Sequence, residues 1–131
     1  MHSTTFPLTG KNKFSVISKL DNRALECQDD GTVIMKDYDP ENPRQIWVVT
    51  NIGHQWINLA TSQPMRAGPG RNWVYNYNAG CINFDCQIYD ARDTTQVLDR
   101  QLCYEEGCGV ITSSANNAED NKLWRFIQLP Q

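Results

Sequence analysis

The sequence predicts an all-β protein built from three similar units. Two stretches align without a gap 77 residues apart, so that Gln45-Ile46-Trp47 falls on Lys122-Leu123-Trp124. Half of that spacing predicts a third copy between them, where Gln87-Ile88-Tyr89 is found. Such a period is typical of folds whose units cannot bury a core alone. We therefore expect three units of about forty residues, approximately 12–52, 53–93 and 94–131.

In the earlier part of each expected unit, an apolar anchor is followed by a short alternating run. The anchors are Leu25, Met65 and Leu102, and the runs are 32–36, 72–77 and 109–113. The runs are rich in β-branched and aromatic residues, which favour strands. Asp-Gly and Gly-Pro-Gly sequences beside them are typical of hairpin turns. No window combines a helical period with a cap, so we expect a chain made almost entirely of strands.

Length and charge predict a single domain over residues 1–131 and exclude several classes of protein. Twelve basic and fifteen acidic side chains leave a net charge of -3 without a basic stripe, so we do not expect nucleic acid as a partner. The first residues lack the pattern of a signal peptide, and no stretch could span a bilayer. We therefore expect a soluble protein without membrane insertion, either cytoplasmic or exported by a route that the sequence does not reveal.

The three triplets resemble the repeat of the ricin B-type, or R-type, lectins, whose units close on Gln-x-Trp. The resemblance covers nearly the whole chain and implies a β-trefoil, in which three four-stranded units surround a pseudo-threefold axis. It implies that Trp47, Tyr89 and Trp124 pack in the shared centre, and that the Gln of each triplet holds backbone groups of the adjoining loop. Lys122 replaces that Gln in the third unit, so its loop is expected to be held differently.

The resemblance also implies a shallow sugar pocket on each unit. R-type lectins use an acid after the anchor, an aromatic ring on the next strand and a polar residue before the triplet. These groups suit a sugar, because its C–H face lies on a ring while its hydroxyls need fixed donors and acceptors. The acid position falls on Glu26, Arg66 and Cys103, and the ring position falls on Lys36 and Ser113 in the outer units. No unit carries the usual galactose-binding set, which predicts altered pockets.

The candidate carbohydrate-binding residues are Glu26, Lys36, Tyr38, Arg44, Arg66, Trp73, Tyr75, Asn76, Tyr77 and Asn121. An exposed ion pair is the alternative for Glu26, Lys36 and Arg44. Trp73, Tyr75 and Tyr77 alternate along one strand and share a face, so at least one of them is expected in the core.

Five cysteines form two pairs of equal spacing and one remainder. Cys81 and Cys86, like Cys103 and Cys108, are separated by four residues, which suits two local disulfides. Free thiols and a four-thiolate zinc site are the alternatives. Cys27 is expected to be a buried thiol. We expect no cofactor and no metal.

The sequence therefore predicts a multivalent glycan-binding lectin rather than an enzyme, because no histidine lies near a nucleophile and no carboxylates form a positioned pair. The resemblance implies galactose or N-acetylgalactosamine termini as ligands, carried by glycoproteins or glycolipids. The first alternative is a trefoil protease inhibitor acting through 68–71 or 78–85. The second is a trefoil module or pore-former subunit that recognises protein or membrane. A homodimer would suit leftover apolar residues such as Ile82 and Phe84.

Overall fold

The computed structural model describes residues 13–50, 54–75, 85–117 and 119–129. Its regular structure is strands with two short 3-10 helices. The strands are β1 (Lys13–Ser18), β2 (Ala24–Cys27), β3 (Val33–Lys36), β4 (Trp47–Val49), β5 (Trp56–Asn58), β6 (Trp73–Tyr75), β7 (Ile88–Asp90), β8 (Asp93–Asp99), β9 (Ile111–Ser114) and β10 (Trp124–Leu129). The short helices are η1 (Pro43–Gln45) and η3 (Asp120–Lys122). The prediction of an all-β chain is confirmed.

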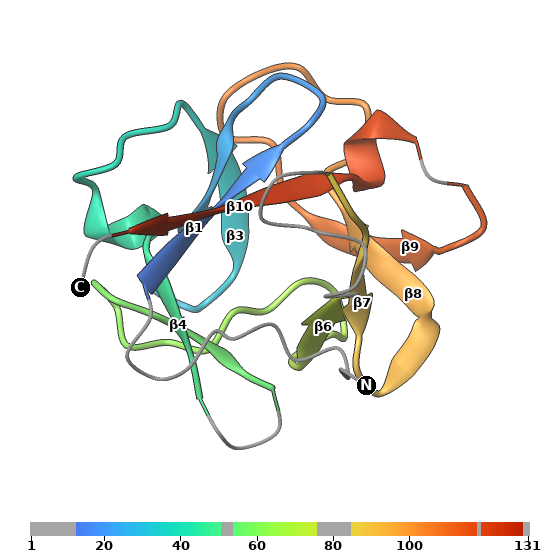
Figure 1. The fold of residues 1–131 in the computed structure, drawn as a ribbon, viewed down its shortest axis with the longest axis horizontal. Coiled ribbons are helices and arrows are strands. Elements are labelled where there is room, and N and C mark those ends of the chain that lie inside the picture. Colours follow the sequence, from blue (N-terminus) through green and yellow to red (C-terminus); the bar gives the residue numbers. More distant parts are fainter. Residues whose placement is uncertain (1–12, 51–53, 76–84, 118, 130–131) are drawn as a thin grey trace.

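Six strands close into a barrel. Strand β1 pairs with β4 and β10, β4 pairs with β5, and β6 pairs with β7, all antiparallel. Two backbone contacts complete the ring: the Trp73 amide donates to the His54 carbonyl oxygen at 2.9 Å, and Cys86 pairs with Trp124. Figure 1 shows the chain passing around the molecule from blue and teal through green to orange and red. A closed barrel leaves no unpaired edge among these strands.

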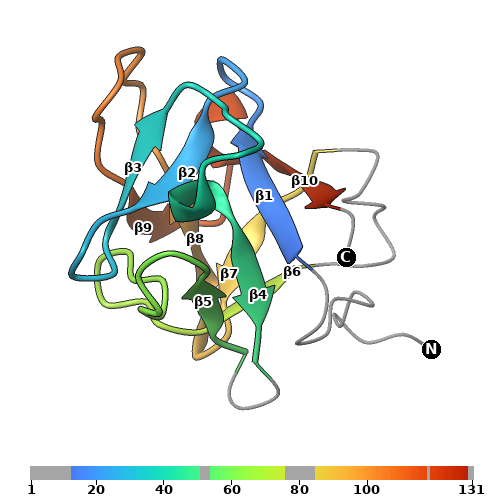
Figure 2. The same cartoon turned by 90° about the vertical axis from the view of Figure 1, so that its left-hand side faces the viewer.

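Hairpins lie across one end of this barrel. Strands β2 and β3 form the first hairpin, and β8 and β9 form another, with Leu25 opposite Met35 and Leu98 opposite Thr112. A much shorter turn, in which Ala67 pairs with Gly70, takes the corresponding place between them in sequence. The hairpins touch where Ile34 pairs with Gly109, and Figure 2 shows β3 beside β9. A barrel of six strands closed by two hairpins and a shorter turn is the β-trefoil that the resemblance implies.

Three tryptophans mark the threefold axis. The indole N–H groups of Trp47, Trp73 and Trp124 donate to the carbonyl oxygens of Leu25, Met65 and Leu98, at 3.4, 3.1 and 3.1 Å. Their registers also agree, because these tryptophans stand opposite Asn58, Asp90 and Ser18 on the neighbouring strand. All three rings are buried and belong to one core cluster. We therefore divide the described chain into unit one (13–49), unit two (54–75) and unit three (86–129).

This division corrects the expected place of Tyr89. Tyr89 lies on β7, the first strand of unit three, and is only half-buried. Its position matches Ile17 and Ile57 on the first strands of the other units, since it stands opposite Val97 as those residues stand opposite Ala24 and Pro64. The core indole of unit two is Trp73. On this division the boundary between the second and third units lies before Cys86 and not between residues 93 and 94, as the expected ranges 53–93 and 94–131 have it.

The anchor of unit three is also corrected. Leu98 is fully buried and accepts the Trp124 indole N–H at its carbonyl oxygen, as Leu25 does for Trp47. Leu102, the expected anchor, has 64% of its surface exposed. The matching of Leu102 with Leu25 by residue count misses the four additional residues that separate anchor and tryptophan in unit three.

Candidate functional site

A buried carboxylate lies at the end of strand β8 in unit three. Asp99 directly follows the anchor Leu98 and is 6% exposed. Its Oδ1 accepts hydrogen bonds from the Asn121 side-chain amide at 2.8 Å and from the Gln101 backbone amide at 2.6 Å. Its Oδ2 accepts from the Ser113 hydroxyl at 2.7 Å. The acid position of unit three is therefore Asp99, and Cys103, expected there, lies in the following loop.

Asn121 leaves an unpartnered oxygen beside this carboxylate. The residue lies on η3, directly before Lys122, and is 5% exposed. Its Nδ2 donates to Asp99, whereas its Oδ1 has no hydrogen-bond partner among the described residues. A buried carbonyl oxygen without a donor is costly, so it favours the approach of a ligand hydroxyl. Asn121, predicted as a site residue, is thus brought together with an acid that the sequence analysis did not select.

The loop of unit three is held differently from that of unit one, as expected. In unit one the Gln45 side chain accepts from the Asp39 amide at 2.8 Å and donates to the Asp37 carbonyl oxygen at 2.9 Å. In unit three the Lys122 ammonium donates to the Ser114 carbonyl oxygen at 2.9 Å. Gln87, on the segment leading into β7, reaches the neighbouring Ala115 carbonyl oxygen at 3.4 Å.

Unit one has an acid in the equivalent position, Glu26. Its Oε1 accepts from the side-chain amides of Asn42, at 2.9 Å, and Gln45, at 3.1 Å. Glu26 and Asp99 correspond in the hairpin register, because they stand opposite Ile34 and Ile111. Both outer units therefore carry an amide-held carboxylate after the anchor.

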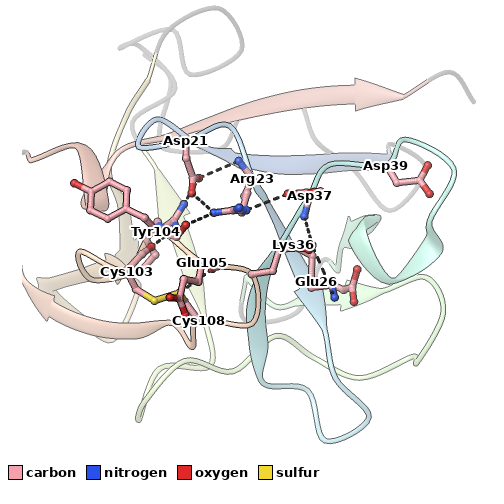
Figure 3. A network of polar contacts seen from close by, with 12 residues as sticks. Asp21, Arg23, Glu26, Lys36, Asp37, Asp39, Cys103, Tyr104, Glu105 and Cys108 are labelled. Carbon is pink, nitrogen blue, oxygen red and sulfur yellow. Dashed lines mark hydrogen bonds and ion pairs between the residues drawn. A yellow bond between two sulfur atoms is a disulfide. The ribbon is translucent and has the colours of Figure 1, made fainter.

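The cationic candidates of unit one are ion-paired. Arg44 donates to Asp29 at 2.8 Å and to the Cys27 carbonyl oxygen at 3.0 Å, and the hydrogen bond with Asp29 raises its pKa above the ordinary value. The Lys36 ammonium lies 3.8 Å from the Glu106 carboxylate. Figure 3 shows Lys36 between Glu26 and the loop of unit three. Tyr38 is half-buried. The exposed ion pair considered for Arg44 and Lys36 is thus present.

Unit two is much shorter than unit one between its anchor and its central tryptophan. Trp73 follows its anchor Met65 by only eight positions, whereas Trp47 follows Leu25 by 22. The omitted length is the part of the unit that carries η1 in unit one. Arg66 occupies the acid position and is half-buried.

Two aromatic candidates of unit two are corrected. Trp73 is 1% exposed and Tyr75 is 4% exposed, so neither offers a ring to a ligand. Tyr75 packs edge-on against Phe126 with the ring centroids 4.6 Å apart. The expectation that at least one of these aromatics lies in the core is confirmed, and the reason is that β6 supplies the central tryptophan. Asn76 and Tyr77 lie outside the described residues.

The cysteines form at least one local disulfide. Cys103 is bonded to Cys108, and Cys86 is also disulfide-bonded, while its expected partner Cys81 lies outside the described residues. Three of the four cysteines are therefore oxidised and cannot act as zinc thiolates, so the four-thiolate alternative is excluded. No cluster of three or more metal-ligating side chains occurs among the residues that the structure describes. Cys27 is a buried free thiol, and burial raises its pKa.

The structure gives little support to loops 68–71 and 78–85 as protease-binding loops. The Arg71 guanidinium donates to the carbonyl oxygens of Gly68 and Gly70, at 3.0 and 2.9 Å, and so closes on its own turn. Most of segment 78–85 lies outside the described residues. Within the described chain, no helix has the length and apolar character needed to cross a bilayer.

Solved structures similar to this chain are β-trefoil proteins. The designed threefold-symmetric protein ThreeFoil has a TM-score of 0.69 at 16% identity, covering 89% of this chain and 99% of its own. The C-half of the earthworm R-type lectin, solved with GalNAc, has a TM-score of 0.69 at 16% identity and covers 90% and 99%. The ricin B-like lectin of Macrolepiota procera, solved with lactose, has a TM-score of 0.69 at 13% identity and covers 93% and 98%.

These structural likenesses confirm the β-trefoil fold. No protein-family model matches the sequence, and no curated protein sequence matches it.

Proposed function

We propose that this protein is a non-enzymatic lectin that binds glycans through unit three. The observation that carries the proposal is the pair formed by Asp99 and Asn121, in which a buried carboxylate and an unpartnered amide oxygen lie side by side. Carboxylate and amide oxygens accept hydrogen bonds from sugar hydroxyls, and an amide nitrogen donates to them. Burial strengthens such bonds because water competes less for the same groups.

Galactose or N-acetylgalactosamine termini are the proposed ligands. The support comes from the fold, because the earthworm lectin was solved with GalNAc and the Macrolepiota lectin with lactose. Ser113 stands where R-type lectins carry a ring, so the pocket differs from the usual galactose set. Glycoproteins and glycolipids that display these termini are the proposed partners.

A second, weaker contact is proposed for unit one. Glu26 repeats the carboxylate, and Arg44 donates to the carbonyl oxygen of the next residue, Cys27. Lys36 pairs with Ala24 at the other end of the hairpin, and Tyr38 follows it in sequence. Arg44 is already ion-paired with Asp29, and Lys36 with Glu106. A ligand therefore has to compete with these ion pairs. Multivalent binding would then use units one and three of one molecule, or the two copies of a homodimer. Arg66 would contribute a ligand contact only from the shortened unit two.

Glycan-array screening followed by calorimetric titration with lactose and N-acetylgalactosamine tests this function. Asp99→Asn should lower the affinity by about tenfold or more, because a charged acceptor is lost. Asp93→Asn is the matched control, since Asp93 is exposed at the first position of β8 in the same unit and accepts only from Thr95 among the described contacts. Glu26→Gln measures the share of unit one. A folded protein that binds no array glycan would contradict the proposal.

A further inference from the structure

Large apolar side chains are exposed mainly around the site of unit three. Among the described residues, four large apolar side chains are exposed, namely Leu59, Leu102, Tyr104 and Ile111. Three of these belong to the β8–β9 hairpin or to its loop. Exposed apolar groups gathered in one place commonly mark a binding surface.

Ile111 lies directly beside the buried carboxylate. It stands opposite Asp99 in the antiparallel register of β8 and β9. Paired residues point to the same face of the sheet with their Cβ atoms about 5 Å apart. Ser113 lies on this face too, because its hydroxyl reaches Asp99 Oδ2 at 2.7 Å. The 38% exposed side chain of Ile111 therefore flanks the polar groups of the site.

The loop that carries Leu102 and Tyr104 starts at the same carboxylate. The Gln101 amide donates to Asp99 Oδ1 at 2.6 Å, and Gln101 adopts a left-handed φ of 61°. The backbone amide of Arg100 donates to the backbone carbonyl oxygen of Asn121 at 3.1 Å. This bond joins the start of the loop to η3. Leu102 and Tyr104, 64% and 61% exposed, follow within five residues of Asp99.

This loop is fixed in place although its side chains are exposed. The Cys103–Cys108 disulfide closes it, and Arg23 donates to the Tyr104 carbonyl oxygen at 2.7 Å. Arg100, which is fully buried, donates to the Cys103 carbonyl oxygen. In Figure 3 the Tyr104 ring points away from Lys36 and the disulfide.

The far side of the loop is bonded to unit one. The Gly107 amide donates to the Met35 carbonyl oxygen at 2.7 Å, and the Met35 amide donates to the Cys108 carbonyl oxygen at 2.9 Å. A loop ordered before binding loses little entropy when a ligand arrives.

We propose that Leu102, Tyr104 and Ile111 form the apolar platform of the glycan site in unit three, replacing the ring that Ser113 lacks. This inference rests on the proposed function. The C–H face of the sugar lies against these side chains while its hydroxyls meet Asp99 and Asn121. Leu102 and Tyr104 follow Asp99 by three and five positions, so the platform extends beyond the polar groups, contacts more than one sugar ring and selects an oligosaccharide over a monosaccharide.

Calorimetric titration with lactose, N-acetylgalactosamine and the strongest array glycan tests the platform. Tyr104→Ala and Ile111→Ala should each weaken binding by about three- to tenfold. Leu59→Ala is the matched control, because Leu59 is 43% exposed in a turn of unit two and should leave the affinity unchanged. The losses should be larger for the array oligosaccharide than for N-acetylgalactosamine.

A double variant, Cys103→Ser with Cys108→Ser, examines the role of the disulfide. It should weaken binding while near-ultraviolet circular dichroism remains that of the folded protein. The platform is overturned if Asp99→Asn abolishes binding while the Leu102, Tyr104 and Ile111 variants all bind like the unmodified protein. Absence of any glycan binding by the unmodified protein would overturn the proposed function and the platform with it.

Discussion

The indole N–H of Trp73 donates to the carbonyl oxygen of Met65 at 3.1 Å, only eight residues earlier in the chain. The equivalent bonds of Trp47 and Trp124 reach back 22 and 26 residues. Unit two thus keeps the central contact of the fold while lacking a segment equivalent to the one that carries η1 in unit one. The contact defines the unit better than its length does.

Trp73→Ala should be far more damaging than Tyr89→Ala. Trp73 is 1% exposed, and removing a buried indole costs about 3–5 kcal/mol of unfolding free energy. Tyr89 is half-buried, and its hydroxyl bonds only to Gln87 among the described contacts, so its loss should cost much less. Urea unfolding followed by circular dichroism measures both. Equal losses would contradict the assignment of Trp73 to the axis.

Gly70→Ala should destabilise the protein because no space exists for a side chain. A Cβ at this position would lie 2.4 Å from Trp73 Cη2, and the buried indole cannot move away. Overpacking of this kind costs about 1–3 kcal/mol. Gly109→Ala is the control, since a Cβ there meets no atom within 4 Å. Thermal unfolding of the two variants should differ by several degrees, and a stable Gly70→Ala protein would contradict the tight packing.

Asp21→Asn should destabilise the protein in a pH-dependent manner. Partial burial acts to raise the pKa of Asp21, but hydrogen bonds from Arg100 and from the Arg23 amide, with the charges of both arginines, lower it below the ordinary value. Arg100 is fully buried and depends on this partner. Breaking a buried ion pair on one side costs about 3 kcal/mol or more at neutral pH.

The sign of the pH effect follows from the lowered pKa. The stabilisation by Asp21 is present above its unfolded-state pKa and is lost as the pH falls through its folded-state pKa. The difference between the variant and the unmodified protein should therefore shrink in acid, as measured by urea unfolding at a series of pH values. Asp37→Asn is the control, because Asp37 is 74% exposed although it also pairs with Arg23. A difference that grows in acid would refute this account.

Cys27 should resist thiol reagents in the native protein. It is 1% exposed, and burial, the largest influence on its pKa, raises that pKa and keeps the thiol protonated at neutral pH. Iodoacetamide labelling with peptide mapping should detect modification of Cys27 only after denaturation. Rapid labelling of the folded protein would show that the core around β2 opens readily.

The sequence predicted the fold through two of its three triplets. Trp47 and Trp124 are related by the axis as their spacing of 77 residues indicated. The prediction of the middle triplet was wrong, and the reason is physical. Unit two is shortened between Met65 and Trp73, and the residues between β6 and β7 restore the count, so that Gln87-Ile88-Tyr89 falls where a triplet is expected. Spacing records chain length, whereas the fold depends on which residues point inward.

The site was predicted only in part for a related reason. The sequence indicates Asn121 as a candidate because it precedes a recognisable triplet. It does not indicate Asp99, because residue count places the anchor at Leu102 instead of Leu98. A usable signal was present, since Val97-Leu98-Asp99 repeats the apolar, leucine, acid order of Ala24-Leu25-Glu26. The sequence does not indicate Leu102, Tyr104 and Ile111 as platform residues. Its spacing predicts Leu102 as an anchor, and the exposure of all three side chains depends on the packed structure.

The shortened loop of unit two shows that a repeat can lose length without losing its place in the barrel. The unit still supplies one inward indole and the carbonyl oxygen that accepts its N–H. Redesign of a single repeat can therefore vary loop length in one third of the molecule without rebuilding the other two thirds.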